Sequence, residues 1–114
     1  MTSPDAHPSS TAWMADCVFT LEFPVALEEA VLDVLLAHPQ WVRGVTVVPV
    51  QGVGVQASLV SAMERVQGRA RRVMVQAVMR HSEVPLLIQA FKQDMSSPEI
   101  LYWATPLLSS GSLS

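Results

Sequence analysis

A cluster of arginines is the feature of this sequence most suited to chemistry. Four of them fall within eight residues: Arg65, Arg69, Arg71 and Arg72. A guanidinium group donates paired hydrogen bonds to phosphates and carboxylates, and several converging groups raise the local affinity for an anion. Gly68, inside the cluster, would let a ligand approach the backbone closely. The cluster therefore predicts a binding site for a small anionic ligand.

The same arginines also have a structural interpretation. The chain of 114 residues has a formal net charge of −3, so carboxylates are available as partners. The arginines could form ion pairs across a contact between subunits, with Glu64, Glu22 or Asp33. The residues alone leave both interpretations open.

The segment before the cluster is predicted to be a mobile loop. Residues 51–64 include Gly52 and Gly54 and follow neither a helical nor a strand periodicity. Ser58 and Glu64 add polar side chains to this loop. Ligand binding at the arginines would order the loop and change the surface that it presents to a partner.

Sulfur and imidazole groups raise the question of a metal site. The chain has one cysteine, Cys17, with three histidines and six methionines. Thiolate and thioether donors suit Cu(I), which makes Cys17 the candidate ligand. The sequence has no Cys-x-x-Cys and no pair of histidines at ligand spacing, which favours the interpretation of Cys17 as a small core residue. Direct copper-type binding or metal tolerance is therefore an alternative function.

No set of residues predicts catalysis, and we expect no enzyme. Cys17 has no histidine and base at a suitable spacing, and the adjacent Glu28 and Glu29 diverge on a helix. The mildly acidic charge argues against a nucleic-acid partner. The first residues lack a signal-peptide pattern, and no stretch has the length and apolar character to span a membrane. These features favour a cytoplasmic protein.

Periodicity predicts the elements that position these residues. Alternating apolar residues predict strands at 17–23, 44–50, 69–79 and 98–108, and helical spacing predicts helices at 25–38 and 83–94. This β-α-β-β-α-β order is typical of a ferredoxin-like α+β fold, with two helices on one face of a four-stranded antiparallel sheet. We expect a disordered leader at 1–14, one domain at 15–108 and a flexible tail at 109–114.

The sheet face opposite the helices is predicted to be too apolar for water. On the strands it would carry Val18, Thr20, Met74, Gln76 and Val78. An antiparallel sheet usually presents a polar outer face, and a contiguous apolar patch usually marks an interface. We therefore predict a homo-oligomer that is joined through Met74, Gln76, Val78 and Trp103. The alternative is that the two ends of the chain fold back over this face.

Several short stretches resemble a known superfamily. They are Pro24 with Leu27 and Glu28, Val50 with Gly52, "ERVQGRARRVMVQ" at 64–76 and "YWATPLLSSG" at 102–111. The chain resembles the PII-like superfamily, which includes the nitrogen-regulatory PII proteins and the CutA divalent-cation tolerance proteins. It is most similar to a family of uncharacterised short PII-like proteins that are often encoded beside heavy-metal efflux pumps.

The resemblance implies an architecture and a role. It implies a homotrimer whose sheets face the threefold axis, with a small ligand at the clefts between subunits and a responsive loop after the second strand. The implied function is a non-enzymatic sensor or regulator linked to metal efflux; a passive adaptor of a membrane efflux pump is the other alternative. Residues 92–100 contain Lys92 but no glycine, so the phosphate loop of the nitrogen regulators is missing and we predict no fixed cofactor.

Overall fold

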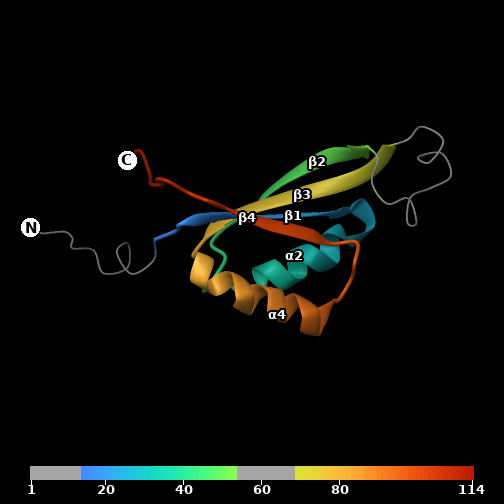
Figure 1. Ribbon diagram of the computed structural model, residues 1–114, viewed down its shortest axis with the longest axis horizontal. Coiled ribbons are helices and arrows are strands. Elements are labelled where there is room, and N and C mark those ends of the chain that lie inside the picture. The colour runs from blue at the N-terminus through green and yellow to red at the C-terminus, as the bar shows by residue number, and fades with distance from the viewer. Residues whose placement is uncertain (1–13, 54–68) are drawn as a thin grey trace, which may run out of the picture.

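The computed structural model describes residues 14–53 and 69–114, and its element order is the predicted one (Figure 1). The strands are β1 (Cys17–Pro24), β2 (Thr46–Val53), β3 (Arg69–Met79) and β4 (Leu101–Pro106). The helices are α2 (Glu28–Leu36) and α4 (Val84–Asp94), which follow the short 3-10 turns Val25–Leu27 and His81–Glu83. The predicted α+β, ferredoxin-like class is confirmed.

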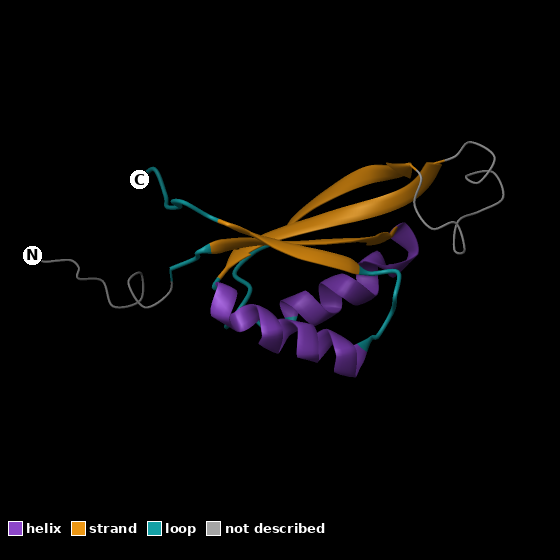
Figure 2. Ribbon diagram, in the orientation of Figure 1, coloured by secondary structure: helices purple, strands orange, loops and turns teal. Residues whose placement is uncertain are grey.

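The four strands form one antiparallel sheet in the order β2-β3-β1-β4. Both helices lie on the same face of this sheet, and the other face carries no helix (Figure 2). The register places Thr20 of β1 between Gln76 of β3 and Trp103 of β4. Because paired residues point to the same side, these three side chains share the face without helices.

The core lies between the sheet and the helices, as the alternation predicted. On β1 and β3, every second residue is buried: Cys17, Phe19, Leu21 and Phe23, and then Val73, Val75, Ala77 and Met79. The helices bury Val31 and Leu35 of α2 and Leu87 and Phe91 of α4 against them. This spacing of three and four residues gives each helix one apolar stripe, which holds both helices on the sheet.

The bounds of several predicted elements differ from the structure, most of all those of β2 and β4. β2 begins at Thr46 and continues to Val53, so Gly52 is a strand residue that pairs with Ala70 and not part of a loop. The two-stranded ladder outweighs the local signal of the glycine, because each added pair satisfies backbone hydrogen bonds. β4 is shorter than predicted at both ends: it begins at Leu101 and ends at Pro106, the last residue paired with β1.

Candidate functional site: the end of strands β2 and β3

The strand register decides which way the arginines of β3 are turned. Arg69 pairs with Val53 and Arg71 pairs with Gln51 at the end of the β2–β3 ladder. Side chains alternate along a strand, so Arg71 and Arg72 lie on opposite faces of the sheet. The side chains of these two neighbouring arginines therefore leave the strand in opposite directions.

Arg71 lies on the face that carries the helices, on the wall of a hollow of about 480 Å³. We call this the β2–β3 hollow. Its wall is formed by Val25, Glu28, Val47, Pro49, Val50, Gln51, Arg71, Arg72 and Val73. The side chain of Arg71 is exposed, and Glu28 stands in the first turn of α2. The hollow thus combines an apolar wall with one exposed cation and one carboxylate, beside the ends of β2 and β3 that lead to residues 54–68.

Arg72 lies on the opposite face and is buried, with 4% of its side chain exposed. Its Nε donates to Oε2 of Glu22 at 2.9 Å, an ion pair. Its Nη2 donates to the backbone carbonyls of Glu22 and Glu99, each at 3.3 Å. The predicted pairing with Glu22 is therefore found for Arg72, but inside one chain and not across a subunit contact. Arg72 links β3 to β1 and to the segment before β4.

The remaining residues of the predicted anion site are not part of the described structure. Arg65, Gly68, Gly54, Ser58 and Glu64 lie outside the described residues, and Arg69 is described only as a strand residue. Their part in a ligand site stays a prediction.

Cys17 occupies the position of a core residue. It is 2% exposed, and burial, followed by the charge of Asp16, raises the pKa of its thiol. A protonated thiol in an apolar setting is a poor metal ligand and a poor nucleophile. Within residues 14–53 and 69–114, no three His, Cys, Asp or Glu side chains are grouped so that they could hold a metal ion.

The histidines of the described part are likewise apart. His38 stacks on Trp41, with 4.7 Å between the ring centroids, just after α2. His81 stands at the other helix, where its backbone N–H donates to Oδ1 of Asp16. In residues 14–53 and 69–114, neither histidine belongs to a group of three side chains that could hold a metal ion, so the structure adds nothing to the metal alternative.

Comparison with protein families assigns the chain. Residues 14–114 match the family described as "Protein of unknown function (DUF3240)". This chain belongs to the DUF3240 family. The predicted membership of an uncharacterised PII-like family is therefore confirmed. A comparison with curated proteins gave no match.

Solved structures show the fold that the DUF3240 chain shares with others. A DUF3240 family protein from Shewanella baltica OS155 superposes with a TM-score of 0.68 at 14% identity, over 89% of this chain and 99% of that one. CPII, a nitrogen regulatory PII-like protein from Thiomonas intermedia K12 bound to ADP, AMP and bicarbonate, gives 0.64 at 16% identity, over 89% and 99%. The apo form of CPII gives 0.61 at 14% identity, over 83% and 91%. At these identities the likeness establishes a PII-like fold.

The predicted interface residues of the DUF3240 protein share the face without helices. Val78 and Trp103 are each 40% exposed there, and Met74 and Gln76 are half-buried. Thr20, expected on the same face, is nearly covered at 1% exposure, and its Oγ1 accepts a hydrogen bond from Nε2 of Gln76 at 3.3 Å. The face without helices is thus mainly apolar, with the hydrogen-bonded pair Thr20 and Gln76 as its polar part.

Two residues with clear local roles were missed by the sequence analysis as site residues. Glu28 forms part of the hollow that holds Arg71, and Glu99 offers its backbone carbonyl to Arg72. Glu28 directly follows a Pro-initiated turn, which is a signal for the start of a helix near the end of β1. The carbonyl of Glu99 has no sequence signal, because any residue at that place would supply it.

In the described part of the chain, no helix has the length and apolar character needed to cross a bilayer.

Proposed function

We propose that this DUF3240 protein is a trimeric PII-like regulator that binds a small phosphate-bearing ligand at the β2–β3 hollow. The observation that carries the proposal is the exposed residue Arg71 on the wall of that hollow. An arginine can hold a phosphate through two parallel hydrogen bonds. Arg65, Arg69 and Gly68 would extend the site from the neighbouring part of the chain.

The class of ligand is supported by a protein of the same fold. CPII is bound to ADP, AMP and bicarbonate, all of which carry negative charge. A hollow of about 480 Å³ lies within the usual range for small-molecule sites, roughly 300–1,000 Å³. We therefore place adenine nucleotides first among the candidate ligands.

The trimer is supported by the face that the helices leave uncovered. Apolar side chains such as Val78 and Trp103 are exposed there, and contact with sister subunits would remove them from water. In such an assembly the end of β2 and β3 of one subunit would lie near a second subunit, which would complete the cleft around the ligand.

The proposed mechanism is a change in what the protein presents to a partner. The β2–β3 hollow adjoins the ends of the two strands that lead into residues 54–68. A ligand held by Arg71 would favour one arrangement of that connection, and new charge-assisted hydrogen bonds would offset the cost of ordering it. The protein would act without catalysis, and a membrane efflux pump is the partner that we propose for the regulated state.

Calorimetric titration with ADP, AMP and ATP tests the proposal. We expect at least one nucleotide to bind and Arg71→Gln to weaken its affinity by about tenfold, the value of one charge-assisted contact. Arg43→Gln removes the same charge from the segment before β2 and is the matched control, with unchanged affinity. The absence of binding by all three nucleotides and by inorganic phosphate, or equal affinities for Arg71→Gln and the unaltered protein, would overturn it.

A further inference from the structure

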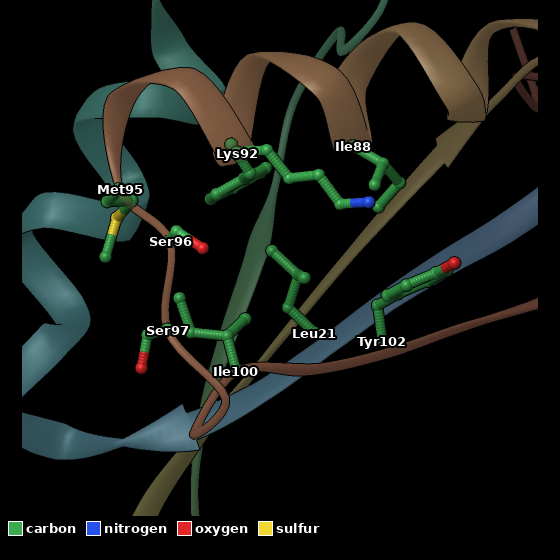
Figure 3. Close-up of a pocket in the computed structure, with 9 residues that line it drawn as sticks. Leu21, Ile88, Lys92, Met95, Ser96, Ser97, Ile100 and Tyr102 are labelled. Carbon is green, nitrogen blue, oxygen red and sulfur yellow. The ribbon is translucent and has the colours of Figure 1, made fainter.

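A second pocket lies at the other edge of the sheet, between α4 and the start of β4 (Figure 3). We call it the α4–β4 pocket, and its volume is about 140 Å³. Its base is formed by Leu21 of β1 and Phe91 of α4, both buried, and Ile100 closes the side next to β4. It shares no lining residue with the β2–β3 hollow.

The segment between α4 and β4 is held in a defined shape at this pocket. Ser97 Oγ accepts the backbone N–H of Glu99 at 3.1 Å, and the backbone N–H of Ile100 donates to the carbonyl of Ser97 at 3.2 Å. The ring of Tyr102 packs at 5.9 Å from that of Phe19, which fixes the far wall. The pocket is therefore formed before any ligand arrives.

One cation stands at this mainly apolar pocket, whose other polar lining residues are Ser96, Ser97 and Tyr102. Lys92 lines it, and its side chain runs along the rim so that the amine points to the side where the Tyr102 hydroxyl lies (Figure 3). In the described part of the chain, no carboxylate pairs with the Lys92 amine. An apolar pocket with a few polar groups at its rim is the usual form of a site for a small organic ligand.

We propose that the α4–β4 pocket binds a small carboxylic acid with an apolar body of about six carbon atoms. The body would lie on Leu21, Phe91 and Ile100, and the carboxylate would accept a charge-assisted hydrogen bond from Lys92, with the Tyr102 hydroxyl as a second donor. The size argues for this class, because an apolar cavity of about 150 Å³ in another protein accepts benzene. The site is separate from the proposed nucleotide site and does not depend on it.

A simpler role for Lys92 predicts a different result. The long stem of a lysine often covers apolar surface while its amine stays in water, with no ligand involved. Lys92→Met keeps an apolar stem and removes the amine, so it separates the two roles. Under the simpler role, the substitution would leave the affinity for a carboxylic acid unchanged.

The test uses benzoate and hexanoate as probes, with benzyl alcohol as the neutral counterpart of benzoate. Lys92 is the only lysine in the chain, so a single side-chain amine resonance reports on the pocket in an NMR titration. We expect a saturable shift of that resonance with both acids, with dissociation constants on the order of 0.1–1 mM for ligands of this size. Benzyl alcohol should bind about tenfold more weakly than benzoate, because it lacks the charge.

Three variants complete the test, and calorimetry and backbone NMR measure how each variant binds the probes. Lys92→Met should weaken benzoate binding about tenfold, to the affinity of benzyl alcohol. Arg80→Met, which removes a positive charge before the opposite end of α4, should leave it within about twofold. Ile88→Phe places a larger ring in the lining and should abolish binding of all three probes while its thermal midpoint stays within a few degrees.

Each contrary result overturns the proposal. The first is the absence of a saturable shift with up to about 10 mM probe, a concentration at which even weak specific binding would be detected. The second is an equal affinity for benzoate in Lys92→Met and the unaltered protein. The third is undiminished binding in a folded Ile88→Phe variant. Equal shifts with inorganic phosphate would mean that Lys92 attracts any anion and that the apolar body is not recognised.

Discussion

The neighbouring arginines Arg71 and Arg72 lie on opposite faces of β3 and differ in their exposure and contacts. On the helix-covered face, Arg71 is exposed at the wall of a hollow of about 480 Å³. On the other face, Arg72 is 4% exposed and bound to Glu22 and to two backbone carbonyls. One peptide bond therefore separates a cation that a ligand can reach from a cation that joins three segments of the fold. The same residue type serves recognition on one face and architecture on the other.

The largest expected difference between the two arginines is in stability. Removing one partner of a buried ion pair leaves the other charge without compensation, which costs about 3–5 kcal/mol. Glu22 is 21% exposed, so we place Arg72→Met at the lower end, about 3 kcal/mol. Arg71→Met should cost less than about 0.5 kcal/mol, because it removes an exposed charge. Urea denaturation at one fixed protein concentration measures both.

A double replacement sharpens this contrast. If the cost in Arg72→Met comes from the uncompensated Glu22, then Glu22→Met combined with Arg72→Met should recover a large share of the lost stability. The matched control is Glu28→Met in combination with Arg71→Met, which should be additive or nearly so. Equal losses for Arg71→Met and Arg72→Met would show that the two faces do not differ in the way described.

The second contrast concerns assembly, and it rests on the proposed trimer. Val78→Glu puts a charge on the face without helices, and burying an unpaired charge between subunits should weaken association by 100-fold or more. Leu86→Glu is the control, because Leu86 is 50% exposed on α4, away from that face. Analytical ultracentrifugation should show dissociation for Val78→Glu and an unchanged mass for Leu86→Glu. A monomeric unaltered protein would exclude the trimer itself.

The sequence predicted the secondary-structure elements and the buried face of each strand better than it predicted the interaction partners of single side chains. The alternation of Val73, Val75 and Ala77 was enough to place one face of β3 in the core, because period-two burial is a local property. The fate of Arg72 was not local. Its partner Glu22 is 50 residues away in the chain, and only the β1–β3 register brings the two together. The arginine cluster therefore appeared as one candidate site, although two of its members point to opposite faces.

The pockets escaped the sequence analysis for a similar reason. The α4–β4 pocket is lined by residues from β1, α4 and the segment before β4, which no spacing rule connects. Its single cation, Lys92, was mentioned in the sequence analysis only because residues 92–100 lack the glycine of a phosphate loop. By contrast, the apolar outer face was predictable, because Met74 and Val78 alternate with core residues on the same strand. The residue types and their periodicity along a strand determine how apolar its exposed face is, whereas a cavity depends on how segments distant in the sequence pack together.

The smallest expected effect concerns Cys17, which lies on the core face of β1. Burial and then Asp16 raise the pKa of its thiol above the ordinary value, so the folded protein holds the proton more firmly than the unfolded chain. Above about pH 8.5, the unfolded chain therefore binds fewer protons than the folded protein. The free energy of unfolding must then fall as the pH rises towards the pKa of Cys17 in the folded protein. Below that range, the thiol makes no pH-dependent contribution.

Cys17→Ala isolates this effect. The difference in unfolding free energy between the unaltered protein and Cys17→Ala should be constant from about pH 6 to 8 and should shrink as the pH rises from there to about 10. The same pair of proteins tests the metal alternative, because a thiol that stays protonated in the core should give equal Cu(I) and Zn(II) titrations with and without Cys17. Tighter Cu(I) binding by the unaltered protein would show that the core opens to present this thiol. It would make the covered face of the sheet, rather than Arg71, the place where a ligand is sensed.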